Sequence, residues 1–417
     1  MFNYPGEHLE KDQQYYKFCL YGFLKNLRFF DAFFILFLVE KGISFTQIGI
    51  LYAAREIASN MLEIPSGILA DSFGRKTTLA GSFLVYICSF SLFYFFTHFW
   101  IYLAAFILFG IGEAFRSGTH KGMIMDYLKI RGFEKQFANY YGHTRSWSQK
   151  GSALSALLAG VIVFSGGDYQ IIFLYSIIPY VINFILIISY PGTLNHSIKT
   201  KTDKKRSRIG ISIRILIVNL KQKQLRRTLY SSAAHSAYLR AIKDYIQLVM
   251  LNLALIIPLL DRVDPKQKSG LIIGVLYFLI FLATSLASKY SSRVAEKIPG
   301  NIILLSLVLG FTAGAISGIS YHFSIWVISL LAFAGIYLLE NLRKPILTGA
   351  VARQVPTEIL SSVLSTQSQL KTVFTSILAV AFGVIADRSG IGISLLAVSG
   401  ILLLFTAMVE LSARKPS

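Results

Sequence analysis

The chain alternates long apolar runs with short polar turns. A membrane-spanning helix needs roughly 20 mostly apolar residues, and about twelve such runs follow one another here. Lipid cannot satisfy exposed backbone polar groups, so only helices and closed barrels span it. Runs of this length predict an all-α membrane protein, with transmembrane helices over 16–38, 45–69, 77–97, 99–127, 139–164, 170–190, 228–258, 269–290, 300–320, 324–350, 359–386 and 391–411.

The composition agrees with a lipid-exposed surface. Hydrophobic residues make up 54% of the 417 residues and charged residues only 15%, whereas soluble domains carry about 25% charged residues. The mean hydropathy is +0.57. The two cysteines, Cys19 and Cys88, give neither a disulfide framework nor a metal-ligand spacing. We expect an integral, multi-pass membrane protein with no metal and no cofactor.

The net charge of +20 is concentrated in alternate loops. This is the pattern that orients membrane proteins, whose cytoplasmic loops are rich in Lys and Arg, and it argues against a nucleic-acid partner. The segment 192–227 is the most basic, with eleven Lys and Arg against the single acid Asp203. We expect a cytoplasmic linker that also contacts anionic lipid headgroups, with an amphipathic helix over Ile209–Leu220. Both termini are expected in the cytoplasm, with the chain in the cell (inner or plasma) membrane.

The two halves of the chain repeat one another. Short patterns recur in the same order, among them Ile48-Gly49 with Ile273-Gly274, Gly160-Val-Ile with Gly383-Val-Ile, and Glu113-Ala-Phe-Arg116 with Glu340-Asn-Leu-Arg343. Equal halves of the same orientation imply parallel repeats about an axis along the membrane normal. We therefore expect a six-helix bundle over 1–191, the linker over 192–227 and a second six-helix bundle over 228–417, related by a pseudo-twofold axis.

A charged, glycine-punctuated turn separates the second and third apolar runs. It reads Gly67-Ile-Leu-Ala-Asp71-Ser-Phe-Gly74-Arg75-Lys76. This turn resembles the signature loop of the major facilitator superfamily, and the twelve-helix layout, basic linker and duplication extend the resemblance over nearly the whole chain. The resemblance implies a permease, and it implies that Asp71 and Arg75 latch the two halves together on the cytoplasmic side. Asp71 would face the start of the eleventh helix near Pro356 and Thr357, where unsatisfied amides favour a carboxylate.

Parts of the family pattern are missing. The equivalent loop of the second half, 290–297, has lost the signature, and the glycine-proline motif found in the fifth helix of many drug antiporters is absent. The stretch Gly383-Val-Ile-Ala-Asp387-Arg388 mimics the signature on the outer side, and we interpret it as an echo of the repeat.

Several predicted spans carry charges, which cost about 2.5–3.5 kcal/mol each near the bilayer centre. The resemblance implies that the first, fourth, seventh and tenth helices line a central cavity. Helical spacing places Arg28 with Asp31, Glu113 with Arg116, and Glu340 with Arg343 on shared faces. The pairs either hold helices in register or bind substrate and protons, and both interpretations are open. The candidate cavity residues are Arg28, Asp31, Glu56, Glu113, Arg116, Arg145, Lys243, Asp244, Glu340 and Arg343. The candidate gate residues are Gly67, Asp71, Gly74, Arg75 and Lys76.

Basic groups slightly outnumber acidic groups in this set, so we expect a small solute with an anionic or zwitterionic part. Proton coupling is a second hypothesis, with Asp31 and Glu113 as candidates, since a membrane carboxyl can exchange a proton for a substrate or an arginine. His235 shows no ligand spacing.

We expect a monomeric secondary active transporter, a symporter or antiporter working by alternating access. The chain has no phosphate-binding G-x-x-x-x-G-K-[ST] loop and no G-x-S-x-G or H-E-x-x-H motif, so neither ATP drive nor an intramembrane enzyme is supported. A multidrug or toxic-compound efflux antiporter and a lipid flippase on the same scaffold are the alternatives.

Overall fold

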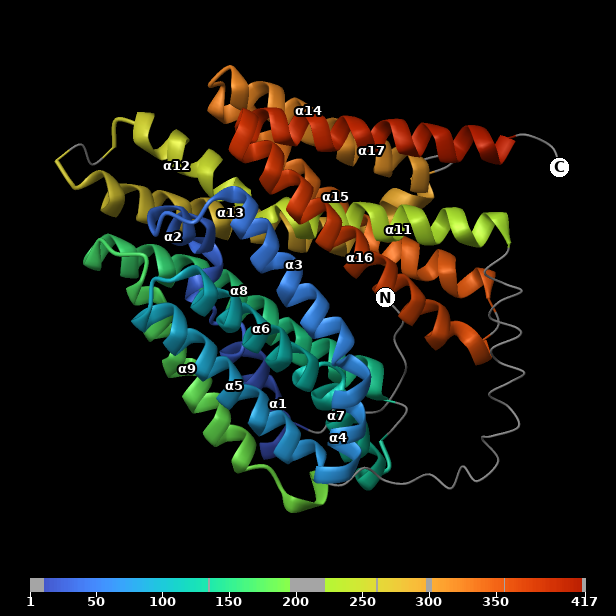
Figure 1. Ribbon diagram of the computed structural model, residues 1–417. Helices are drawn as coiled ribbons and strands as arrows, with labels where there is room; N and C mark the ends of the chain where they lie inside the picture. Colours follow the sequence, from blue (N-terminus) through green and yellow to red (C-terminus); the bar gives the residue numbers. More distant parts are fainter. Residues whose placement is uncertain are drawn as a thin grey trace. The chain divides into compact units, whose positions relative to one another are not determined.

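The computed structural model describes residues 11–133, 136–195, 222–259, 262–297, 302–355 and 357–414. Regular structure in these residues is helical throughout, with no strand (Figure 1). The predicted linker helix at Ile209–Leu220 lies outside the described residues. The chain forms two compact units, one of residues 1–31 and 58–200, the other of residues 32–57 and 201–417. Residues 32–57 therefore group with the C-terminal half, whereas the sequence assigned them to the first bundle; the predicted boundaries at 191 and 228 stay a prediction.

The helices of the first unit are α1 (Gln13–Leu24), α4 (Glu63–Phe73), α5 (Arg75–Phe95), α6 (Phe99–Arg116), α7 (Thr119–Arg131), α8 (Phe137–Gly166) and α9 (Ile171–Ile188), followed by the short η3 (Gly192–Leu194). α5 packs along α6 and α9, and α1 packs against α8 (Figure 1). Aromatic side chains fill the core between them: Tyr86 contacts Phe83, Phe90 and Tyr180 at ring-centroid distances of 5.3–6.3 Å. This core fixes the positions of α1 and α6, whose ends carry the candidate site.

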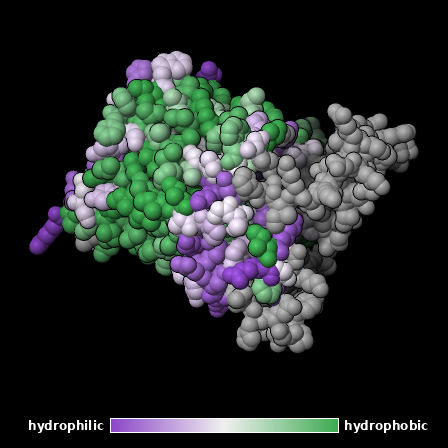
Figure 2. Space-filling model, turned by 90° about the horizontal axis from the view of Figure 1, so that it is seen from below, coloured by the Kyte–Doolittle hydropathy of each residue, from purple (hydrophilic) through white to green (hydrophobic). Residues whose placement is uncertain are grey.

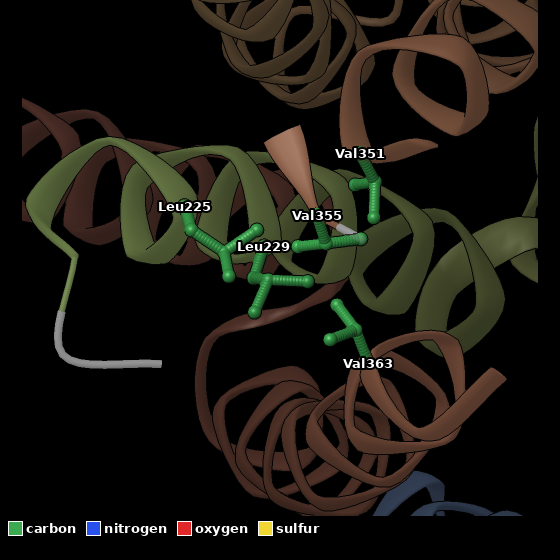
Figure 3. Packing of buried hydrophobic residues seen from close by; sticks show 5 residues of the cluster. All are labelled: Leu225, Leu229, Val351, Val355 and Val363. Carbon is green, nitrogen blue, oxygen red and sulfur yellow. The ribbon is translucent and has the colours of Figure 1, made fainter. Parts of the chain in front are cut away.

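The second unit contains α2 (Phe34–Glu40), most of α3 (Phe45–Met61), α11 (Lys223–Ile242), η4 (Lys243–Tyr245), α12 (Ile246–Ile256), α13 (Pro265–Lys297), α14 (Ile302–His322), α15 (Trp326–Gln354), α16 (Thr357–Ser389) and α17 (Ile391–Arg414). α14 packs between α15 and α17, and α11 packs against α15 and α16. Figure 3 shows Leu225 and Leu229 of α11 meeting Val351, Val355 and Val363 in a buried cluster. This cluster ties α11 to the turn that joins α15 and α16.

Four of the predicted single helices are interrupted, and one of them, over 99–127, breaks at Ser117 and Gly118. The expected helix over 16–38 ends at Leu24 and restarts through η1 (Phe29–Ala32) and α2. The expected helix over 45–69 breaks at Leu62, and that over 228–258 tightens into a 3-10 turn at Lys243–Tyr245. At the break after Leu24 the Asn26 side chain donates to the Gly22 carbonyl at 2.7 Å, a local bond that competes with helix continuation. The interruptions fall where hydropathy was weakened by charges.

Eight of the described helical segments are long and apolar enough to cross a membrane. They correspond to the predicted spans 77–97, 99–127 and 170–190, and to the five predicted spans that follow residue 265. Many of their large apolar side chains are exposed, including Ile178, Ile182 and Ile185 along α9. Figure 2 shows one face of the molecule largely covered by hydrophobic residues, with hydrophilic residues gathered in a smaller patch. Such a surface needs lipid rather than water around it.

The stretch that mimics the signature turn has a structural role that the sequence did not reveal. Asp387, near the end of α16, accepts hydrogen bonds from the backbone N–H groups of Phe45 and Thr46, both at 2.8 Å. These are orphan donors at the start of α3, which lies in the same unit. The carboxylate of Asp387 therefore caps α3 from outside that helix.

Candidate functional site

A cavity of about 340 Å³ opens within the first unit, where α1 and α6 end beside α8. Two helix breaks border it: Lys25 and Asn26 follow α1, and Ser117 and Gly118 separate α6 from α7. The remaining lining residues are Phe18, Tyr21, Gly22, Arg116, His120, Lys121, Tyr141, Thr144, Arg145, Ser148 and Gln149. Helix ends thus bring polar groups to a site that apolar helices surround.

The lining of this cavity is cationic. Its described residues include Lys25, Arg116, Lys121 and Arg145, and none of them is Asp or Glu. Arg116 donates its Nε–H to the Tyr86 hydroxyl at 3.2 Å, a neutral partner, and interacts electrostatically with Glu113, which does not line the cavity. Charges away from bulk water need compensating partners. The cavity is therefore suited to an anion.

His120 adds an unmet hydrogen-bonding group to the cavity. Its ring stacks on Tyr21 with 3.7 Å between centroids, and its buried Nε2 has no hydrogen-bond partner among the described residues. Buried polar atoms are nearly always paired, so such an atom calls for an explanation. A bound solute or water in the cavity would supply the missing partner.

Other predicted residues of the first unit lie beside this cavity. Arg28 Nη2 is 3.8 Å from Glu113 Oε1, and its Nε–H donates to the Tyr180 hydroxyl at 3.1 Å. The Arg28 and Glu113 side chains are 18% and 17% exposed. Asp31 lies in η1, on the short segment after the break in the first predicted helix. Glu113, the acid nearest in sequence to Arg116, is thus already paired with Arg28.

The predicted residues of the second unit form a polar network. Glu56 accepts from Arg240 at 2.6 Å and from Arg55 at 3.1 Å. Asp244 pairs with Lys243 at 3.1 Å and accepts from the Tyr52 hydroxyl at 2.7 Å. Three cations face two acids here, and each acid is paired with at least one cation, which favours the interpretation that these pairs hold helices together.

Glu340 and Arg343 lie three residues apart on α15 and interact electrostatically, but their hydrogen bonds go to other partners. Glu340 Oε2 lies 2.8 Å from His235 Nδ1, and Ser236 donates to Oε1 at 2.5 Å. Arg343, 1% exposed, instead donates to the hydroxyls of Ser231 and Ser306 at 2.8 and 2.6 Å and to the carbonyls of Ser231 and Ile303. A buried guanidinium takes whichever acceptors surround it, and here two neighbouring helices provide them.

A second cavity, of about 350 Å³, lies in the second unit near the ends of α11, α14 and α17. Its lining includes Lys223 and Arg227, but Arg227 is engaged by the Glu410 carboxylate. Because that ion pair compensates much of the charge, this cavity is less suited to an anion than the first.

The gate residues lie in the first unit at the junction of α4 and α5. Gly74 has φ +97°, a conformation that side chains disfavour, and it lets the chain turn between the two helices. Arg75 donates to Asp126 at 2.5 Å, and Lys76 donates to the Tyr190 carbonyl at 2.7 Å. Gly67 lies within α4. The side chain of Asp71 and the position of Pro356 are outside the described residues, so the predicted latch stays a prediction.

Some site residues were not selected from the sequence. Lys25, His120 and Lys121 line the cavity, and His235 contacts Glu340 across 105 residues of sequence. One signal was present, since Lys25-x-x-Arg28 recurs as Arg240-x-x-Lys243 in the second half. No spacing rule links His235 to Glu340, because the two lie on different helices.

Comparison with known proteins gives the same architecture. The family model of the Major Facilitator Superfamily matches residues 22–373. The uncharacterized MFS-type transporter YxaM of Bacillus subtilis (strain 168) is 36% identical over 90 residues, which are 22% of this chain and 23% of that protein. The chain thus matches about a quarter of that relative's length.

Solved structures resemble the whole chain. The nucleoside transporter NupG has a TM-score of 0.74 at 11% identity, covering 97% of this chain and 100% of its own. A D-xylose-proton symporter has a TM-score of 0.67 at 14% identity, covering 95% of both chains. A peptide transporter POT in complex with sulfate has a TM-score of 0.68 at 13% identity, covering 99% of this chain and 96% of its own. At these identities the likeness shows the fold. The chain is an all-α, multi-pass membrane protein, and its twelve predicted spans are consistent with the fold of these transporters.

Proposed function

Because the chain belongs to the major facilitator superfamily, we propose that it moves a small anionic or zwitterionic solute across the cell membrane by alternating access, coupled to protons. The family makes it a membrane transporter. The solute class and the coupling are the proposal.

The cationic cavity of the first unit is the observation that carries the solute class. It is lined by Lys25, Arg116, Lys121 and Arg145 together with hydroxyl and amide donors such as Thr144, and none of the lining residues that the structure describes is an acid. Its volume of about 340 Å³ lies within the usual size range of small-molecule sites. A solute with a carboxylate or phosphate would replace the water that these cations otherwise need.

The similar structures do not narrow the solute further. Those proteins are named as carriers of a nucleoside, of D-xylose and of a peptide. These compounds differ in charge and shape, so the assignment here rests on the residues of this chain.

The orientation and surroundings follow from the loop charges. With the basic loops inside, both termini and the linker 192–227 lie in the cytoplasm, and the linker lies at anionic lipid headgroups. The gate residues around Arg75 then lie on the cytoplasmic face. We propose a monomer in this arrangement, with the small solute, protons and lipids as partners, and no enzymatic activity.

Flux into proteoliposomes tests the proposal. Purified full-length protein is assayed with succinate, glycerol 3-phosphate, alanine, xylose and uridine, with and without an inward proton gradient. We expect gradient-driven uptake of an anionic or zwitterionic member. Ethidium efflux tests the drug-antiporter alternative, and phospholipid scrambling tests the flippase alternative.

Arg116→Ala and Lys129→Gln are matched variants for this assay. Each removes one cation, but Lys129 is exposed in the last turn of α7 and does not line the cavity. A hydrogen bond to a charged group contributes about 1.5–3 kcal/mol, so Arg116→Ala should weaken apparent affinity roughly 10- to 150-fold. Lys129→Gln should transport as the unaltered protein does. Transport of only uncharged compounds, unchanged by Arg116→Ala, would contradict the proposal.

A further inference from the structure

We propose that Glu340, held by His235 and Ser236, is the group that takes up and releases the coupling proton. The inference rests on the proposed function, since it supplies the proton site of a proton-coupled transporter. It moves that site from Asp31 and Glu113, the candidates of the first unit, to the second unit.

The Glu340 site is enclosed, and both oxygens of its carboxylate have a hydrogen-bond partner. His235 is 0% exposed and the Glu340 side chain 15%. His235 Nδ1 lies 2.8 Å from one carboxylate oxygen and the Ser236 hydroxyl 2.5 Å from the other. Both partners come from α11, whereas Glu340 lies on α15. A proton bound here is held between two helices of one unit.

The partners of Glu340 differ in kind from those of three other acids in the helices. Glu56 is engaged by Arg240, Glu113 by Arg28, and Asp244 by Lys243. Arginine and lysine stay charged throughout the physiological range, so protonating those carboxylates would abandon an ion pair. A hydroxyl and an imidazole keep a hydrogen bond to either form of a carboxyl group. Glu340 therefore accepts a proton without leaving a permanent cation unpaired.

The charged groups around Glu340 are few. On its own helix Arg343 interacts electrostatically with Glu340, but its terminal nitrogens, Nη1 and Nη2, donate to Ser231, Ser306 and the Ile303 carbonyl. From α16, Lys371 interacts electrostatically with Glu340. α11 carries Arg240, which bonds to Glu56. α14 contributes the uncharged Gly310 and Phe311. Lys371 and Arg343 favour the carboxylate, so the proton is released again rather than trapped.

His235 limits where the proton can go. Its Nε2 is buried without a hydrogen-bond partner among the described residues, and it faces Gly310 so closely that an added Cβ there would clash with the ring. An N–H at that atom would have no acceptor, so the ring keeps its single proton on Nδ1 and donates it to Glu340 Oε2. An incoming proton then bonds to Oε1, and the Ser236 hydroxyl turns from donor to acceptor. On release the proton leaves Oε1 and Ser236 donates again.

Uptake of a proton also matches an anionic cargo. Each unit of negative charge moved inward opposes an inside-negative membrane potential by about 2.3 kcal/mol per 100 mV. One proton bound for each such charge cancels this opposition. The proton site and the cationic cavity therefore serve the same transport cycle.

Infrared difference spectroscopy of the purified full-length protein between about pH 5 and pH 9 tests the assignment without a solute, over the range in which a coupling group must titrate. We expect a protonated-carboxyl band that appears on acidification in the unaltered protein and in Glu113→Gln, and is lost in Glu340→Gln. In His235→Ala the midpoint pH of this band should rise by about one unit or more, because the carboxylate loses a donor. In His235→Asn the midpoint should return most of the way to that of the unaltered protein. A band that survives Glu340→Gln, a missing band in the unaltered protein, or His235 variants without effect would overturn the assignment.

Flux gives the second readout, using the panel member with the highest uptake. Glu340→Gln should abolish accumulation driven by a proton gradient and retain exchange of labelled for unlabelled solute, while Glu40→Gln, which alters an acid paired with Lys266 outside the cavity, should retain both. Gradient-driven accumulation by Glu340→Gln equal to that of the unaltered protein would overturn the inference. Since the infrared measurement needs no solute, it distinguishes failure of this site from failure of the proposed function.

Discussion

Arg116 and Arg343 occupy matching positions in the repeats of the two halves, but their surroundings in the structure indicate different roles. Arg116 borders the cavity, whereas Arg343 is 1% exposed and donates from both terminal nitrogens to groups of its own unit. Replacing Arg343 with alanine should therefore reduce stability rather than alter solute recognition. Four hydrogen bonds, at 2.6–3.0 Å, would be lost to Ser231, Ser306 and Ile303.

The magnitude follows from those contacts. Each bond to a charged group contributes about 1.5–3 kcal/mol, but the mutation also removes the cost of burying the charge. Leaving the buried acceptors of Ser231, Ser306 and Ile303 without this donor is expected to cost about 1–3 kcal/mol. For a unit of this size each kcal/mol lowers the midpoint by roughly 2–4 °C, so the expected loss is roughly 2–12 °C.

Thermal unfolding of purified protein in detergent, followed by tryptophan fluorescence, measures this loss. Arg116→Ala is the matched control, and its midpoint should stay within a few degrees of the unaltered protein. Equal midpoints for Arg343→Ala and the unaltered protein would refute a structural role for Arg343. A larger loss in Arg116→Ala than in Arg343→Ala would refute the division of roles between the two arginines.

Three further predictions concern single contacts. Gly310→Ala should displace His235 and shift the pH dependence of transport as His235→Ala does, measured by flux across a pH series; an unshifted profile would contradict the close packing. Asp387→Ala should lower thermal stability by about 0.5–2 kcal/mol through loss of the α3 cap, with Asp387→Asn close to neutral; equal losses in the two variants would refute a capping role. Asp71→Asn should slow turnover while leaving membrane insertion intact, as shown by flux against surface labelling; normal flux would argue against the latch.

The sequence predicted the spans well because lipid imposes a strong and local constraint. The spans after residue 265 agree with α13 to α17 within a few residues. The breaks near Lys25 and Leu62 were missed, since a hydropathy window averages over a few polar residues and cannot detect where backbone bonds are lost.

The site was predicted in part. Spacing along one helix identified charged positions but missed His235 as a partner of Glu340, because the two are distant in sequence. The cavity was missed as a unit for the same reason: Lys25, His120 and Arg145 come from three separate helical segments. The sequence showed that basic side chains outnumber acidic ones among the candidates. Only the fold shows which of these side chains lie close together.

Calorimetric titration of the purified protein with the panel solutes tests the central claim most directly, namely that the cationic cavity of the first unit binds an anionic solute. We predict that succinate, glycerol 3-phosphate or alanine binds, that Arg116→Ala weakens this binding roughly 10- to 150-fold, and that Lys129→Gln leaves it unchanged. Binding of xylose or uridine alone, with the same affinity in Arg116→Ala, would contradict the account.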